Sequence, residues 1–146
     1  MNNLKEGDKA PPFLELNANK GSTVVVYFYP KDFTPGCTTE ACEFRDLYAK
    51  VEEQNAVVLG VSPDSPESHE KFIADLGLPY SLVPDEAHEV AVAYGVWKEK
   101  SMYGRKFMGI ERSTFVISPD GTIKKIFRRV KPAGHAAEVL TAVSST

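Results

Sequence analysis

The sequence has few cysteines and no long apolar run. Its 146 residues include two cysteines, Cys37 and Cys42, whereas small exported domains use several disulfides to replace a missing core. The longest apolar run, Val24 to Tyr29, is far shorter than the roughly 20 residues that cross a bilayer. The chain also starts with polar residues, so we expect no signal peptide. These absences favour a cytoplasmic protein with no membrane anchor and with a core large enough to fold without disulfides.

The sequence also lacks an excess of positive charge and the fingerprints of common cofactors. It has 17 basic and 20 acidic residues, a net charge of −3 and a pI near 5.6, whereas nucleic-acid-binding domains are usually basic. No glycine-rich phosphate loop occurs, and His69, His88 and His135 lack the paired spacing of a zinc site. We therefore expect no nucleic-acid partner, no metal and no cofactor.

What remains is the composition of one globular domain, residues 1–146. Hydrophobic residues make up 42% and charged residues 25% of the chain, both close to the globular average. Apolar patterning predicts strands over 23–29, 56–61, 81–83, 114–117 and 123–127. It predicts helices over 38–54, 65–76, 86–94 and 136–143. This order predicts an α/β fold, with a central mixed sheet covered by helices on both faces.

Cys37 lies where a chemically reactive cysteine would be expected. The buried strand ends before Pro30, the residues from Lys31 to Gly36 are expected to form a loop, and a helix is predicted from Thr38. A helix start presents unpaired amide donors and a partial positive charge. Both favour the thiolate, which is the nucleophilic form of cysteine.

Cys42 lies inside the same predicted helix, five residues after Cys37. Five residues of helix rise about 7.5 Å and turn the two side chains about 140° apart, whereas a disulfide needs Cα atoms about 4.4–6.8 Å apart. The two cysteines can therefore bridge only if the helix unwinds locally. Geometry alone leaves two interpretations open, a redox switch or a Cys42 that merely packs against apolar neighbours.

The residues around Cys37 resemble a known signature. The segment Pro30 to Cys37, PKDFTPGC, matches the peroxiredoxin pattern Pro-x-x-x-Thr-x-x-Cys, and the continuation TTEAC resembles the peroxiredoxin Q subfamily, also called bacterioferritin comigratory protein. Further similar segments are GVSPDS at 60–65, YGVW at 94–97 and GIERSTF at 109–115. The stretch between Leu16 and Val24 is shorter than in that family, which leaves its layout open.

The resemblance implies a thioredoxin-like fold and reduction of hydrogen peroxide and organic hydroperoxides. Cys37 would be the peroxidatic cysteine and would become a sulfenic acid. Cys42 matches the resolving cysteine of part of the subfamily and would form an intramolecular disulfide with Cys37. Thioredoxin, or a glutaredoxin-type dithiol, would restore the thiols. The subfamily also suggests a monomer.

The resemblance assigns roles to four residues around Cys37. Thr34 and Arg112 would hold the peroxide oxygens and stabilise the charge that moves onto the leaving oxygen. Pro30 would shield the site from water. Glu40 would orient an arginine, although an acid near a helix start is also favoured by the helix dipole alone.

Two further hypotheses stay open from the sequence. A general thiol-disulfide oxidoreductase on the same fold would usually carry a Cys-x-x-Cys motif, which is absent here. A non-catalytic, chaperone-like binding domain would carry cysteines with no chemical role. Insulin reduction without peroxidase activity would favour the first, and activity that survives alkylation of both thiols would favour the second.

Overall fold

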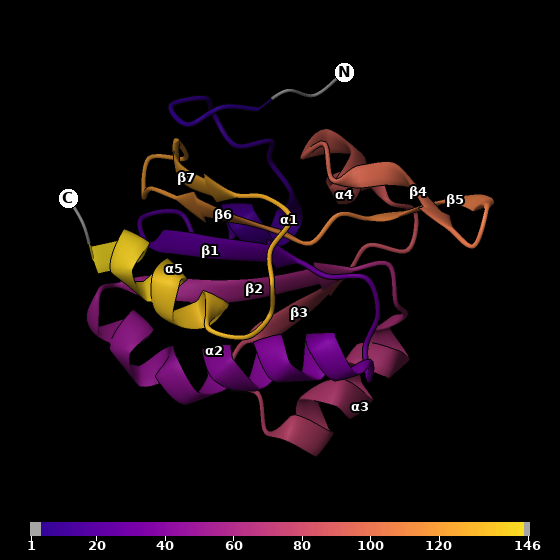
Figure 1. The fold of residues 1–146 in the computed structure, drawn as a ribbon. Helices are drawn as coiled ribbons and strands as arrows, with labels where there is room; N and C mark the ends of the chain where they lie inside the picture. Colours follow the sequence, from indigo (N-terminus) through magenta and orange to yellow (C-terminus); the bar gives the residue numbers. More distant parts are fainter. Residues whose placement is uncertain (1–3, 145–146) are drawn as a thin grey trace.

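A five-stranded mixed sheet forms the centre of the fold (Figure 1), in a computed structural model that describes residues 4–144. The strand order is β3-β2-β1-β6-β7, and β1 pairs in parallel with β2 and antiparallel with β6. The strands are β1 (Thr23–Phe28), β2 (Ala56–Ser62), β3 (Ser81–Pro84), β6 (Ser113–Ile117) and β7 (Ile123–Phe127). A separate hairpin contains β4 (Trp97–Met102) and β5 (Arg105–Ile110). The helices are α1 (Leu14–Asn17), α2 (Pro35–Glu53), α3 (Pro66–Leu76), α4 (Glu89–Ala93) and α5 (His135–Ser144).

The central strand β1 is buried on both faces because helices cover both. Side chains of a strand alternate between faces, so Val25 and Tyr27 join a core with α2, α3 and α5, while Val26 and Phe28 join a second core. Figure 1 shows α2, α3 and α5 on one side of the sheet. The mixed sheet with helices on both faces, predicted from the sequence, is confirmed.

Tyr27 fixes α2 against the sheet. Its ring stacks on Phe44 of α2 with centroids 4.8 Å apart. Its hydroxyl lies 2.9 Å from that of Tyr80, which in turn donates to the carbonyl of Ala41 in α2 at 3.0 Å. Gly60 makes room for the ring, since a Cβ at that position would lie 2.9 Å from Tyr27. These contacts set the position of the helix that carries both cysteines.

The start of α2 differs from the sequence prediction. The helix begins at Pro35 instead of Thr38, with Thr34 as an extended N-cap. Proline is favoured at the first helical position because its fixed φ suits the helix and its missing amide would have no partner there. The expected loop from Lys31 to Gly36 therefore ends at Thr34, and Cys37 lies within the first helical turn.

The β4–β5 hairpin and the one-turn helix α1 were not predicted. Most side chains of β4 and β5 are exposed or half-buried, so these strands lack the apolar pattern that marks a buried strand. The connecting Tyr103 and Gly104 both have positive φ, 53° and 76°, as a two-residue hairpin turn requires. A glycine between two short strand-like segments was the available signal.

Helices of membrane-spanning length and hydropathy are absent from residues 4–144.

Candidate active site

The site is built around Cys37, the third residue of α2. Its side chain is 1% exposed and belongs to the core under α2, α3 and α5. The preceding Thr34 has extended backbone angles and Pro35 starts the helix. The first N–H groups of a helix have no acceptors within the helix and point outward from its N-terminal end. Cys37 therefore lies in a dry environment where partial positive charge favours an anionic sulfur.

Arg112 adds a full positive charge beside Cys37. Its Nη2 donates to the Cys37 sulfur at 3.3 Å, and its Nη1 donates to Oε1 of Glu40 at 2.6 Å. Burial lowers the pKa of Arg112, but Glu40 and Cys37 raise it by more, so the side chain stays cationic. A Cβ on Gly36 would lie 3.4 Å from Nη2, so the glycine lets the guanidinium approach the helix closely. A cation at this distance stabilises a thiolate.

Glu40 is fully buried and forms an ion pair with the same arginine. Only Oε1 contacts Arg112, and Oε2 has no hydrogen-bond partner within residues 4–144. Burial raises the pKa of Glu40 to about 7, although the nearby Arg112 acts in the opposite direction. Desolvation outweighs the ion pair because one of the two oxygens that share the negative charge is buried without a donor.

The shifted pKa of Glu40 predicts a pH-dependent stability. An unperturbed glutamate titrates near 4.5, so the folded protein holds this proton more tightly and loses stability as the pH rises from about 4.5 to 7, by on the order of 2–3 kcal/mol. We expect Glu40→Gln to gain about that much stability relative to the parent protein between about pH 5 and pH 8. Urea unfolding at several pH values measures this change.

The control for this prediction is Glu53→Gln, an exposed glutamate on the same helix. Its stability relative to the parent protein should not change with pH. A Glu40→Gln variant whose relative stability is equally independent of pH would show that Glu40 is already ionised below pH 5.

Thr34 and Pro30 lie on the loop that enters α2. The Thr34 hydroxyl donates to the carbonyl of Lys31 at 2.8 Å, so it is directed back to the loop and not to Cys37. Pro30 is half-buried at the end of the strand. The structure thus links Cys37, Arg112 and Glu40 by direct contacts, and the described contacts do not join Thr34 or Pro30 to them.

Cys42 lies in the same helix as Cys37, and both are free cysteines. Cys42 is half-buried, whereas Cys37 is fully buried. The helix is continuous between them, so their Cα atoms are separated by about 7.5 Å of helical rise. The sequence placed Cys42 inside a helix that starts at Thr38, whereas α2 starts at Pro35 and contains both cysteines. Direct bonding of the sulfurs therefore requires a local change in α2.

A buried polar cluster that the sequence did not predict contains Asp32 of the same loop. Asp32 is 3% exposed and contacts Tyr29, Ser68 and His69, while its backbone contacts Asp64. The partners come from three segments of the chain: the end of β1, the turn after β2, and α3. The similar segment GVSPDS, which contains Asp64, was the available signal.

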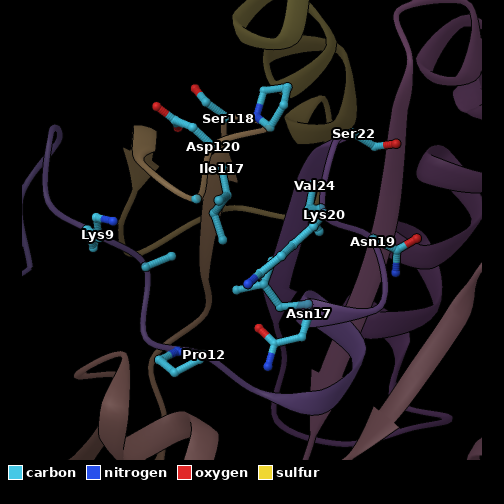
Figure 2. A pocket seen from close by; sticks show the side chains of 14 residues that line it. Lys9, Pro12, Asn17, Asn19, Lys20, Ser22, Val24, Ile117, Ser118 and Asp120 are labelled. Atoms are coloured by element: carbon cyan, nitrogen blue, oxygen red, sulfur yellow. The ribbon is translucent and has the colours of Figure 1, made fainter.

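The cavity in Figure 2 lies at the other end of the sheet. Its volume is about 270 Å³, and its walls include Lys9, Lys20 and Ile117. It opens beside the start of β1, whereas Cys37 follows the end of that strand. The stretch between Leu16 and Val24, whose layout the sequence left open, forms the end of α1 and a turn and contributes to this wall.

Comparison with known proteins shows which family the chain belongs to. The profile of the AhpC/TSA family matches residues 4–126. The chain belongs to this family. Among curated relatives of this peroxiredoxin, Peroxiredoxin Bcp of Bacillus subtilis (strain 168) is 50% identical, and the match covers 94% of this chain and 93% of the relative. Peroxiredoxin Bcp of Escherichia coli (strain K12) is 41% identical, with 96% of both chains covered.

Solved structures of peroxiredoxin Q proteins superpose closely on this peroxiredoxin. A cysteine-to-serine variant of Xylella fastidiosa PrxQ has a TM-score of 0.90 at 41% identity and covers 97% of this chain and 96% of its own. The bacterioferritin comigratory protein of Xanthomonas campestris, studied for alkyl peroxide reduction, has a TM-score of 0.84 at 48% identity and covers 88% and 82%. The protein is therefore a thiol peroxidase of the Bcp/peroxiredoxin Q group, with the thioredoxin-like fold that the resemblance implied.

Proposed function

We propose that this peroxiredoxin reduces hydrogen peroxide and organic hydroperoxides with Cys37 as the peroxidatic and Cys42 as the resolving cysteine. The observation that carries the proposal is the 3.3 Å contact from Arg112 to the Cys37 sulfur in the first turn of α2. Alkyl hydroperoxides are included because the similar Xanthomonas campestris protein was studied for their reduction.

In the first step the Cys37 thiolate attacks the nearer oxygen of the peroxide. The O–O bond breaks, Cys37 becomes a sulfenic acid, and the departing oxygen takes a proton and leaves as water or an alcohol. The Arg112 guanidinium and the amides of the first turn stabilise the charge that moves onto that oxygen. A rotation of the Thr34 hydroxyl away from Lys31 would add one more donor, and Pro30 would limit water access.

In the second step the Cys42 sulfur attacks the sulfenic sulfur of Cys37. Water leaves and a disulfide forms. The first turns of α2 must unwind for this, because the intact helix separates the two residues by about 7.5 Å. An external dithiol, thioredoxin or a glutaredoxin-type donor, then reduces the disulfide by exchange. All reacting groups belong to one chain, so a monomer in the cytoplasm, where such dithiols are kept reduced, suffices.

The Cys42→Ser variant tests the two-cysteine cycle. It should consume the first equivalent of peroxide at the parent rate, within about twofold, because Cys37 and Arg112 are untouched. Thioredoxin-dependent turnover should fall by about 100-fold or more, since no disulfide is available for exchange. Rapid-mixing consumption of peroxide and a coupled steady-state assay measure the two quantities. Steady-state turnover at the parent rate would rule out Cys42 as the resolving residue.

Hydrogen exchange on the oxidised protein tests the unwinding. Peroxide should join Cys37 to Cys42, with the loss of two hydrogens in mass, and should lower amide protection over residues 38–45. Protection in the later turns of α2 should stay unchanged and serves as the internal control. A disulfide that forms with full protection of 38–45 would contradict the helix geometry described above.

A further inference from the structure

Asp32 is the centre of a buried hydrogen-bond network that the reaction described above does not use. It lies between the end of β1 and the start of α2. Its Oδ1 accepts from the Tyr29 hydroxyl at 2.6 Å, and its Oδ2 contacts the Ser68 hydroxyl at 2.8 Å and His69 Nδ1 at 2.7 Å. The carboxylate therefore connects the loop before Cys37 to α3.

The contact between Asp32 and His69 is an ion pair when both ring nitrogens carry protons. His69 Nε2 lies 3.1 Å from the carbonyl oxygen of Val83, and a carbonyl can only accept. Burial raises the pKa of Asp32, but hydrogen bonds from His69, Tyr29 and Ser68 outweigh it, so the net pKa lies below the usual range. An ionised carboxylate also only accepts, so both contacts of the ring are satisfied together by the imidazolium.

A second anchor holds the backbone of Asp32. Its amide donates to Oδ2 of Asp64 at 2.7 Å, and the same oxygen accepts from the Ser62 hydroxyl at 2.8 Å. Ligand atoms of Asp32, Asp64 and His69 lie within 4.8 Å of one another, a distance that would suit a metal ion. The carboxylate oxygens of this cluster already accept hydrogen bonds. The cluster therefore serves to hold the loop in place, not to bind an ion.

The residue after this anchor has a strained backbone. Phe33 has a φ of 66°, in the left-handed region that L-residues other than glycine, asparagine and aspartate rarely adopt. Its ring packs edge-on against Phe72 of α3, with centroids 5.1 Å apart. Thr34 follows as the N-cap of α2. A residue stays in such a conformation only where its surroundings fix both neighbours, and here Asp32 is fixed on one side and α2 on the other.

We propose that Asp32 and His69 are positioning residues for Cys37. Their network holds the loop so that Phe33 adopts the left-handed conformation and α2 starts at Pro35. In this arrangement Arg112 reaches the Cys37 sulfur. The inference rests on the proposed role of Cys37 as the peroxidatic cysteine. It goes further by assigning the start of α2 to a buried ion pair that is separate from the contacts of Arg112.

The proposal predicts opposite effects on the two chemical steps. Attack on peroxide needs the folded first turn, so a weaker anchor should slow it. Disulfide formation needs that turn to unwind, so a weaker anchor should leave it unchanged or make it faster. A side chain that only stabilises the protein would not separate the two steps in this way.

Asp32→Asn is the test, because asparagine keeps the shape but loses the charge and one acceptor. Its matched control is Asp85→Asn, another buried acid, which accepts from the amides of Val90 and Ala91 at 3.1 and 2.9 Å in α4. Sulfenic acid formation is followed by trapping and mass spectrometry in a Cys42→Ser background. Disulfide formation is followed by quenched mass spectrometry with both cysteines present.

For Asp32→Asn we expect sulfenic acid formation to slow by about tenfold or more, with disulfide formation at or above the parent rate. Asp85→Asn should leave both rates within about twofold. Equal slowing of both steps, or sulfenic acid formation within about twofold of the parent, would overturn the proposal. If Asp32→Asn does not fold, Ser68→Ala, which removes one donor to the carboxylate, should still slow the first step by about threefold and not the second.

Phe33 supplies a rescue experiment. Glycine adopts the left-handed conformation readily, whereas alanine keeps the strain and removes the ring. Asp32→Asn combined with Phe33→Gly should therefore recover about fivefold in sulfenic acid formation relative to Asp32→Asn combined with Phe33→Ala. Equal rates for the two double variants would contradict the role of the anchor. If peroxide consumption survives in Cys37→Ser, the proposed function fails instead, whatever Asp32 does.

Discussion

Replacing Cys37 by serine is expected to abolish peroxide reduction, lowering kcat/KM by a factor on the order of 10⁴ or more. The serine hydroxyl does not ionise near neutral pH, so the positive charge of Arg112 has no anion to stabilise at this position. Loss of the nucleophile also removes the sulfenic acid on which the later steps depend. The measurement is a steady-state assay with thioredoxin, its reductase, hydrogen peroxide and an alkyl hydroperoxide.

The Cys37→Ser variant should fold like the parent protein, because only one side-chain atom changes and the serine oxygen can also accept a hydrogen bond from Arg112. Its thermal unfolding serves as the control that separates lost chemistry from lost structure. Cys42→Ser, assayed beside it, should still consume one equivalent of peroxide. Substantial turnover by Cys37→Ser would show that another group performs the first step.

The local pattern of the sequence predicts most of the fold because its elements are buried and regular. β1 is apolar on both faces, as a strand covered on both sides must be. α3 begins at Pro66 after a serine cap and ends at Leu76, followed by Gly77 in the left-handed conformation; local chemistry alone decides both ends. The hairpin of β4 and β5 escaped prediction because its side chains are mostly exposed and thus carry no apolar pattern.

The site was only partly predictable, because its contacts join distant parts of the chain. Cys37 could be located from its place between a strand and a helix, and Arg112 from the resemblance alone. The contact of Arg112 with Glu40 spans 72 residues, and that of His69 with Asp32 spans 37. No local periodicity encodes such pairs. They depend on which strand ends the sheet brings together, which is why the anchor at Asp32 became visible only in the structure.

Replacing Arg112 is expected to have the second largest effect on the first chemical step. Arg112→Met removes the charge and both donors, and should slow sulfenic acid formation by about 100-fold to 1,000-fold, as for loss of a group that stabilises charge in the transition state. Arg112→Lys keeps a charge but not the planar fork that contacts Cys37 and Glu40 together. It should therefore still lose about tenfold or more. Single-turnover trapping of the sulfenic acid measures both.

Comparing Arg112→Met with Arg112→Lys separates the effect of the positive charge from the effect of the planar guanidinium. Arg129→Lys is the matched control, since Arg129 is a surface arginine with one longer contact to Glu111 at 3.7 Å, and it should leave the rate unchanged. Combining Arg112→Lys with Glu40→Gln tests whether the carboxylate holds the cation in place. If Glu40 orients the guanidinium, Glu40→Gln should slow sulfenic acid formation only slightly once Arg112 has been replaced by lysine. The effects of the two substitutions on the rate will then not add. Additive losses would mean that Glu40 and Arg112 act on Cys37 independently.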